Sequence, residues 1–350
     1  MPADVVLGWD IGGAHLKVAA ADGKGRVMQV AQLPCPLWLG LEHLDHAISA
    51  ALAEMPSARL HALTMTGELT DFFRNRAQGV KSIIARFAMQ TPVNRTVVYA
   101  GPAGFLTPQN AVRKTAAVAS ANWAASAQLV ASRMADALFV DIGSTTTDLV
   151  PVHGGVLRVR GFSDADRLAC EELVYTGVVR TPIMALANRI PIDGQWIPAM
   201  AEYFATMADV YRLTGELPES ADQLPAADNG GKTVRDSARR LARMIGRDLE
   251  SAPLLQWKQC ARQLADLQLW QIRQACERVL SRTVANDRSP VVGAGTGRFL
   301  VRKLAAQLGR RYRDFDTLID AAPDAASWAS SCAPAVAVAI LAQAQPRKHK

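Results

Sequence analysis

Two aspartates stand out in this sequence, because each follows an apolar run and precedes an Ile-Gly pair. Asp10 lies in LGWDIGGAHLKVA (7–19) and Asp141 in FVDIGSTTTDLV (139–150). An aspartate at the end of a buried strand points into a cleft, and the glycine after it lets the backbone approach a ligand closely, because no Cβ blocks it. Backbone N–H groups in such turns form an anion-binding concavity. The two turns together predict a site that grips a di- or triphosphate from both sides.

The residues expected to contact the phosphates follow the two aspartates. They are Gly12, Gly13, His15 and Lys17 in the first turn and Gly143, Ser144, Thr145 and Thr146 in the second. Asp10 and Asp141 are expected to be catalytic by holding a hydrated Mg²⁺ between them, since Mg²⁺ prefers one or two carboxylates plus phosphate oxygens. The alternatives are a solvated strand position for Lys17 and a structural role for His15.

A third glycine-rich turn, GAGTG, follows a short apolar run near the end of the chain. Alone it is a weak signal, and a single Asp-Ile-Gly would be an ordinary β-turn. The three turns in this order are far more specific. The third turn is therefore expected to form a wall of the nucleotide or ligand site, through Gly293, Gly295, Thr296 and Gly297.

The segment TMTGELTDFF (64–73) supplies a candidate general base. Glu68 follows a predicted strand end and the flexible Gly67, and a carboxylate there could deprotonate an amine nucleophile. Thr66, Gly67 and Asp71 are expected to contact the substrate, although Asp71 could instead cap the helix that follows.

The segment YTGVVRTPI (175–183) supplies a candidate phosphate clamp. Arg180 could hold a diphosphate through a bidentate contact. A surface salt bridge is the alternative for Arg180. Thr176 is expected to line the same turn and to contact the substrate.

The elements that must position these residues occur twice along the chain. Residues 4–22 read as two strands joined by a Gly-Gly turn, with a third strand after them, and residues 137–159 repeat that order. Amphipathic helical patterns follow each set. This predicts two α/β domains, 1–134 and 135–350, with an interdomain cleft and a helical insertion at about 195–285. A helix is expected over 71–90, and another over 117–134.

Composition bounds the class of protein. The 350 residues carry a net charge of +7, spread over helices apart from the terminal PRKHK, so we expect no nucleic-acid partner. Five scattered cysteines without a CxxC pair fit a reducing cytoplasm. We see no signal peptide, and CAPAVAVAILAQAQ is too short and Ala-rich to span a bilayer, so it is expected to be a buried helix without membrane contact.

The order of the three turns resembles the actin, sugar kinase and Hsp70 ATPase superfamily, over nearly the whole chain. The resemblance implies the actin-like ATPase (ribonuclease H-like) fold. Within it, the segments 64–73 and 175–183 look like the short hydantoinase/oxoprolinase-related proteins, in the branch linked to tetrahydromethanopterin-dependent one-carbon transfer that is similar to archaeal methanofuran synthase. That likeness implies a transferase that joins an aminomethylfuran-methyl diphosphate to a γ-glutamyltyramine-like amine and releases diphosphate.

One difference from the superfamily's first phosphate motif concerns the use of ATP. Many superfamily ATPases carry Thr or Ser two positions after the first motif's glycine, where this chain has Ala14 and His15. A hydroxyl that would touch a γ-phosphate is missing, which argues against ATP hydrolysis. Mg²⁺ is the expected cofactor, and whether ATP binds is left open. The alternatives are an ATP-dependent kinase or hydantoinase-like amidohydrolase and, less favoured, an ATP-switched binding module. The expected partners are small molecules, the furan diphosphate and the amine, with a homodimer as an option.

Overall fold

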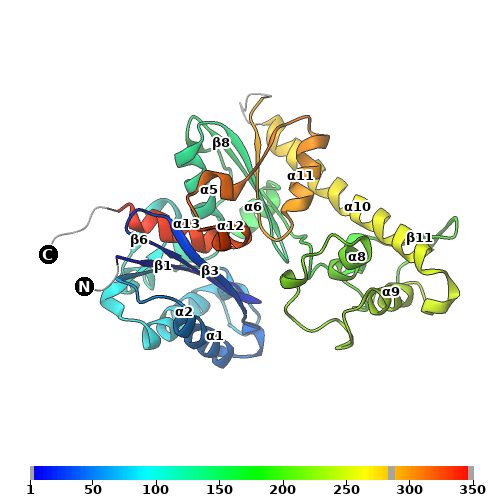
Figure 1. Cartoon of the computed structure of the whole chain (residues 1–350), viewed down its shortest axis with the longest axis horizontal. Helices are drawn as coiled ribbons and strands as arrows, with labels where there is room; N and C mark the ends of the chain where they lie inside the picture. The colour runs from blue at the N-terminus through cyan, green and yellow to red at the C-terminus, as the bar shows by residue number, and fades with distance from the viewer. Residues whose placement is uncertain (1–3, 283–287, 346–350) are drawn as a thin grey trace.

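The computed structural model describes residues 4–282 and 288–345, which form two α/β halves (Figure 1). The first half is built on a six-stranded sheet in the order β3-β2-β1-β4-β5-β6. Strands β1, β2 and β3 are antiparallel, whereas β4 and β5 run parallel to β1. The strands are β1 (Val6–Ile11), β2 (His15–Ala21), β3 (Val27–Pro34), β4 (Leu60–Met65), β5 (Thr96–Tyr99) and β6 (Phe105–Leu106).

The second half repeats this plan. Its sheet has the order β10-β8-β7-β13-β14, with β9 also paired to β8, and β7 and β8 form the antiparallel hairpin. The strands are β7 (Ala137–Ile142), β8 (Thr147–His153), β9 (Val156–Leu157), β10 (Leu173–Val174), β13 (Val291–Ala294) and β14 (Tyr312–Asp314). A separate hairpin consists of β11 (Arg189–Ile192) and β12 (Gln195–Pro198).

The helices cover both sheets and fill the space between them. Their bounds are α1 (Leu41–Glu54), α2 (Arg76–Gln90), α3 (Pro108–Ala111), α4 (Thr115–Val118), α5 (Asn122–Arg133), α6 (Asp164–Ala169), α7 (Ile183–Leu186), α8 (Met207–Thr214), α9 (Val234–Arg243), α10 (Leu254–Ser281), α11 (Arg298–Gln307), α12 (Pro323–Ala329) and α13 (Ala333–Gln343). One core joins the first sheet to α1 and α2, a second lies between the sheets around α5 and α13, and a third joins the second sheet to α10 and α11.

Equivalent positions of the two hairpins carry the two aspartates. In the β1–β2 pair Asp10 lies opposite Lys17, and in the β7–β8 pair Asp141 lies opposite Asp148. A parallel strand, β4 or β13, flanks each aspartate strand on its other side. The repeat predicted from the sequence thus extends to strand register.

The two halves exchange helices across the predicted boundary at residue 134. Helix α5 precedes this boundary but packs on β7, β8 and β9, whereas α13 comes last and packs on β1, β2 and β4. The segment expected to be a buried helix is α13, which is buried almost throughout. In the described ranges no single helix has the length and apolar composition to cross a bilayer, and α12 with α13 meets that test only as a pair bent by 116°. The basic residues 346–350 lie outside the described residues.

Two predicted helices begin later than the sequence pattern suggested. The helix expected from residue 71 begins at Arg76, because the Asn75 side chain accepts a hydrogen bond from the backbone N–H of Gln78 and caps it. The capping alternative for Asp71 is therefore wrong. The helix expected over 117–134 begins at Asn122, because Ser120 adopts a positive φ of 50° and separates it from α4.

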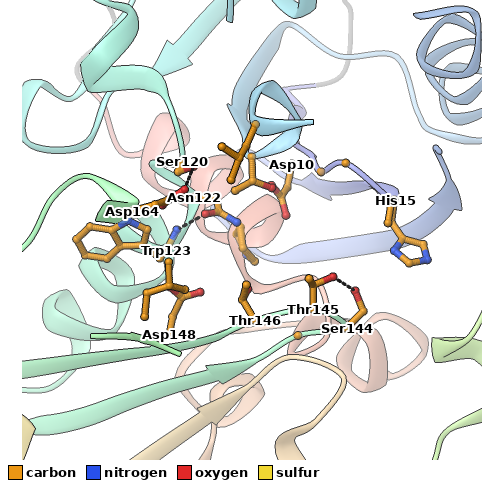
Figure 2. A pocket seen from close by; sticks show the side chains of 18 of the residues that line it. Asp10, His15, Ser120, Asn122, Trp123, Ser144, Thr145, Thr146, Asp148 and Asp164 are labelled. Atoms are coloured by element: carbon orange, nitrogen blue, oxygen red, sulfur yellow. Dashed lines mark hydrogen bonds between the residues drawn. The ribbon is translucent and has the colours of Figure 1, made fainter. Parts of the chain in front are cut away.

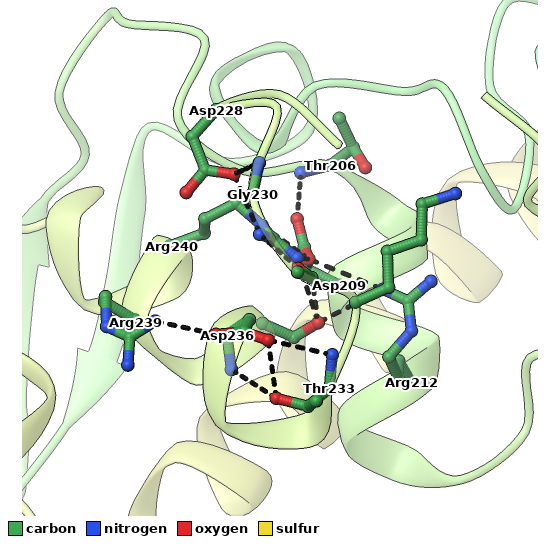
Figure 3. Close-up of polar contacts among 12 residues, drawn as sticks. Thr206, Asp209, Arg212, Asp228, Gly230, Thr233, Asp236, Arg239 and Arg240 are labelled. Atoms are coloured by element: carbon green, nitrogen blue, oxygen red, sulfur yellow. Dashed lines mark hydrogen bonds and ion pairs between the residues drawn. The ribbon is translucent and has the colours of Figure 1, made fainter. Parts of the chain in front are cut away.

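A buried ion network holds the helical insertion together (Figure 3). The Arg240 guanidinium is 1% exposed and donates to Asp209 Oδ1 at 2.7 Å and to Asp228 Oδ1 at 2.9 Å. The polar loop before α9 reaches the first half, where Gln223 Nε2 donates to the backbone carbonyl of Gln32 in β3 at 3.2 Å. The network therefore fixes the loop that bridges the two halves.

Gly8 in β1 sets how closely α13 lies on the first sheet. A Cβ at this position would stand 2.0 Å from the carbonyl oxygen of Ala335 and 2.6 Å from the backbone nitrogen of Ala339. Both contacting atoms belong to the helix backbone, which cannot avoid the clash by changing rotamer as a side chain can.

We expect Gly8→Ala to lower the free energy of unfolding by roughly 3 kcal/mol, because overpacking against backbone forces α13 off the sheet. Urea denaturation measures the change. In the control Gly23→Ala the new methyl group would meet the movable side chain of Asp4, and a loss below about 0.5 kcal/mol is expected. Equal losses in the two variants would contradict the close contact.

Candidate active site

A cleft of about 510 Å³ lies where the two Asp-Ile-Gly turns face each other (Figure 2). Most of the residues predicted from the sequence line it. These are Asp10, Gly12, Gly13, His15, Lys17, Thr66, Asp71, Asp141, Gly143, Ser144, Thr145, Thr146 and Arg180. The structure thus brings together residues from both halves of the chain.

The two turns share one hydrogen-bond pattern. The N–H of Gly12 donates to the carbonyl of His15 at 2.9 Å, and the N–H of Gly143 donates to the carbonyl of Thr146 at 2.8 Å. Each bond closes a tight turn directly after a buried strand. The side chains of Ser144 and Thr145, 3.4 Å apart between their hydroxyl oxygens, lie on the cleft surface.

The segment 176–180 braces the second turn from behind. The N–H of Val178 donates to the carbonyl of Gly143 at 3.1 Å, and that of Arg180 to the carbonyl of Ser144 at 2.8 Å. Thr176 is 1% exposed, and its hydroxyl accepts from Gln268 Nε2 at 2.7 Å. Thr176 therefore supports the turn and does not line the cleft, whereas the Arg180 side chain does, with its guanidinium carbon 4.8 Å from the Trp38 ring centre.

Asp10 and Asp141 lie near Lys17 in the cleft, and Asp148 lies near both aspartates. Burial raises the pKa of Asp10 and Asp148, and raises that of Asp141 to about 7, with further increases from the neighbouring carboxylates. Lys17 Nζ lies 4.0 Å from Asp10 Oδ2. Burial opposes the charge on Lys17, but Asp10, followed by Cys332 and Asp141, raises its pKa overall.

The carboxylates fit a hydrated Mg²⁺ held jointly with a ligand. Asp10 Oδ1 is buried and has no hydrogen-bond partner among the described residues, and the donors are all oxygen. The described ranges contain no group of three His, Cys, Asp or Glu side chains arranged to hold a metal by themselves. Mg²⁺ usually takes one or two carboxylates and completes its shell with water and phosphate oxygens, which matches this donor set.

His15 lies beside the first turn as a neutral side chain. It is 6% exposed, and burial, with Lys17 and Arg180 nearby, lowers its pKa to about 3. Its Nε2 is buried without a hydrogen-bond partner in the part of the chain that the structure describes. A neutral imidazole with an unpaired nitrogen can donate to or accept from a ligand.

Glu68, the predicted general base, lies one layer behind the cleft. It is 1% exposed in the short helix Gly67–Leu69, and its Oε1 accepts from Ser120 Oγ at 3.0 Å. Ser120 lines the cleft, and Glu68 does not. The Ser120 hydroxyl links Glu68 to the cleft, and the structure gives no support to direct contact between Glu68 and a substrate.

The GAGTG turn packs against the strand that carries Asp141. A Cβ on Gly295 would stand 2.1 Å from the Ile142 carbonyl oxygen, and one on Gly297 2.5 Å from Ile142 Cγ2. The N–H of Gly297 donates to that carbonyl at 2.8 Å. The cleft lining within the described residues does not include this turn, and its glycines serve close packing of α11 on β7.

Sequence reasoning missed several residues of the cleft. They are Trp38, Ser120, Asn122, Trp123, Asp148, Asp164, Arg167 and Tyr175. Asp148 had a usable signal, because it stands as far after Asp141 as Lys17 stands after Asp10. The others come from α5, α6 and connecting segments that no local pattern assigns to the site.

The model of the hydantoinase/oxoprolinase family matches residues 59–344. Two relatives carry the name (4-{4-[2-(gamma-L-glutamylamino)ethyl]phenoxymethyl}furan-2-yl)methanamine synthase. The relative from Methanocaldococcus jannaschii is 30% identical, and the match covers 85% of this chain and 88% of the relative. The relative from Methanococcus vannielii is 31% identical, and the match covers 32% of this chain and 50% of the relative. The nucleotide-free structure of an ATP-dependent acetone carboxylase matches 96% of this chain and 70% of its own, with 10% identity and a TM-score of 0.57. The predicted resemblance and the actin-like fold class are thereby confirmed.

The raised pKa of Asp141 predicts a pH-dependent stability. Because its folded-state value of about 7 exceeds the ordinary 3.8, its contribution to stability is present at pH 4 and is lost as the pH rises through 7. Without divalent cations, Asp141→Asn should therefore raise the melting temperature at pH 7.5, and this gain should vanish near pH 4. Mg²⁺ at pH 7.5 should raise the melting temperature of the unmodified protein more than that of the variant.

Differential scanning fluorimetry across pH, with and without Mg²⁺, measures both effects. The control is Asp45→Asn, whose carboxylate pairs with Arg86 at 2.9 Å outside the cleft and should show no gain at pH 7.5. A less stable Asp141→Asn variant at pH 7.5 would contradict the electrostatic account of the cleft.

Proposed function

The chain belongs to the hydantoinase/oxoprolinase family, and on that premise we propose that it is a transferase that forms an aryl ether during biosynthesis of a methanofuran- or methylofuran-type one-carbon carrier. The name of the relatives describes a compound in which a phenoxy oxygen is joined through a methylene to a furan that carries a methanamine. The nucleophile that we propose is accordingly a phenol oxygen, in place of the amine nitrogen expected from the sequence.

The proposed reaction breaks one C–O bond and forms another. The bond between the furan methylene and its diphosphate breaks, and the electron pair leaves on the diphosphate. A lone pair of the phenol oxygen forms the new bond to the methylene, and the phenol proton passes to a carboxylate. The furan stabilises the developing cation, so the protein mainly neutralises the departing charge and positions the phenol.

The two turns are the proposed diphosphate site. Backbone N–H groups of both turns, the Ser144 and Thr145 hydroxyls, Lys17 and Arg180 would face the diphosphate. Asp10 and Asp141 would hold Mg²⁺, which when bound supplies positive charge to the leaving group. The single observation that carries the proposal is this pair of aspartates on opposed phosphate-type turns, in a chain whose relatives are named for a furan ether.

Asp148 is the carboxylate that we propose as proton acceptor. It lines the cleft, and its Oδ1 accepts from Arg167 Nη1 at 2.6 Å, which orients it. Burial raises its pKa, and a carboxylate of raised pKa is a better acceptor for a phenol proton.

ATP consumption is the competing possibility, as in a kinase or an ATP-driven amidohydrolase. Two observations favour a substrate diphosphate instead. Ala14 provides no hydroxyl beside the first turn, and the cleft lining among the described residues does not include the GAGTG turn.

The decisive assay supplies a furfuryl diphosphate and a 4-alkylphenol with Mg²⁺ and follows diphosphate and ADP separately. We expect diphosphate release coupled to ether formation without added ATP. Asp10→Ala should reduce this rate by roughly 10²-fold or more, because several kcal/mol of charge neutralisation are lost. Asp45→Asn should retain the rate. ADP formed in proportion to product would refute the proposal in favour of an ATP-dependent enzyme.

A second pair of variants identifies the base. Asp148→Asn should lower the rate by roughly 10² to 10⁴ at pH 7, and by less at pH 10, where the phenol ionises without help. Glu68→Gln should have a smaller effect on the maximal rate, since Ser120 separates Glu68 from the cleft. Single-turnover rates across pH distinguish the two. A larger and pH-dependent loss in Glu68→Gln would restore Glu68 as the base that the sequence suggested.

A further inference from the structure

One end of the cleft, here called the acidic end, is formed by Ser120, Asn122, Trp123 and Asp164 (Figure 2). Figure 2 shows these side chains gathered on the side of the cleft opposite His15. Asp164 comes from α6 in the second half, whereas Ser120 and Asn122 flank the start of α5. Nothing in the proposed diphosphate chemistry uses this end.

Ser120 lies between two carboxylates that can accept its hydrogen bond. Its hydroxyl lies 3.0 Å from Glu68 Oε1 and 3.1 Å from Asp164 Oδ2, but a single O–H can donate to only one of them. The hydroxyl itself accepts from Arg76 Nη2 at 3.0 Å. Arg76 Nη2 also donates to Asp164 Oδ2, so Asp164 has a donor even when the Ser120 hydroxyl donates to Glu68.

The charges at the acidic end are unbalanced. Arg76 pairs with Asp164 and lies 3.8 Å from Glu68. Two carboxylates thus share one guanidinium group. One positive charge is missing if both carboxylates are ionised. Burial raises the pKa of Glu68.

Two almost fully buried side chains at this end have polar atoms without partners. Glu68 Oε2 has no hydrogen-bond donor, and Trp123 Nε1 has no acceptor, among the described residues. Glu68 is 1% and Trp123 3% exposed. A buried polar atom without a partner costs on the order of 1–3 kcal/mol, and of these two atoms the Glu68 oxygen is the one that a cation could satisfy.

We propose that the acidic end binds a primary ammonium group of a substrate. The ammonium would donate to Asp164 and to the remaining lone pair of Ser120, and its charge would balance Glu68 behind them. The proposal deepens the proposed function and rests on it for the choice of ligand, because the compound in the relatives' name has two primary amine sources, the methanamine on the furan and the γ-glutamyl group. With the ammonium here, a diphosphate on the same furan would lie toward Lys17 and the two turns.

Binding of simple probes tests this site without any catalysis. Isothermal titration at pH 7.5 would compare furfurylamine with furfuryl alcohol, which has the same ring without the ammonium, and with γ-glutamylethylamide. We expect furfurylamine or γ-glutamylethylamide to bind at least tenfold more tightly than furfuryl alcohol. The amine that binds identifies which substrate occupies the acidic end.

Variants tie the binding to these residues. Asp164→Asn should weaken binding of the preferred amine at least tenfold. Should that variant not fold, Ser120→Gly removes the hydroxyl while suiting the positive φ of this position, and it should also weaken binding. Asp45→Asn, the matched surface carboxylate, should bind the amine within twofold of the unmodified protein.

Equal binding of the amines and furfuryl alcohol would overturn the proposal, and so would unchanged amine affinity in a folded Asp164→Asn or Ser120→Gly variant. The result is separable from the proposed reaction. Amine binding that depends on Asp164, without diphosphate release from a furfuryl diphosphate, would keep the ammonium site and reject the transferase. Ether formation without Asp164-dependent amine binding would keep the transferase and reject the ammonium site.

Discussion

The structure depends on one electrostatic constraint, the placement of one buried and two partly buried carboxylates at the meeting point of two sheets. Asp10, Asp141 and Asp148 all have a raised pKa, and Lys17 and Arg167 are the cations that face them. Carboxylates gathered in this way repel one another and lose solvation, so the arrangement costs stability. Such a cost is expected at a functional site, where a metal ion or a cationic substrate group offsets it.

Close packing makes that placement rigid. The second turn is held from behind by the backbone of 176–180 and from the side by the GAGTG turn, where glycines allow contacts that no side chain would permit. Gly8 similarly lets α13 lie directly on β1. Helix α13 also packs on α5, and it therefore links the strand that carries Asp10 to the second half.

The charge distribution along the cleft suggests how a substrate would be oriented. Lys17 and Arg180 lie among the two turns, while Asp164 and Glu68 lie at the acidic end. A small molecule with a diphosphate at one side of a furan and an ammonium at the other would fit these charges in one orientation, with the diphosphate at the two turns and the ammonium at the acidic end. Aromatic side chains, among them Trp38, Trp123 and Tyr175, also line the cleft and would pack against flat rings.

The two repeated hairpins, their Asp-Ile-Gly turns and the family could be predicted from the residues alone, because strand alternation and turn residues are local patterns. Asp148 could also have been predicted, because it occupies the position in the repeat that Lys17 occupies in the first hairpin. In contrast, it took the fold to show that Glu68 lies behind Ser120, that the GAGTG turn packs against Ile142, and that Trp123 and Asp164 belong to the cleft. Those facts depend on how α5, α6 and α11 pack across the two sheets, and long-range packing leaves no periodic trace in the sequence.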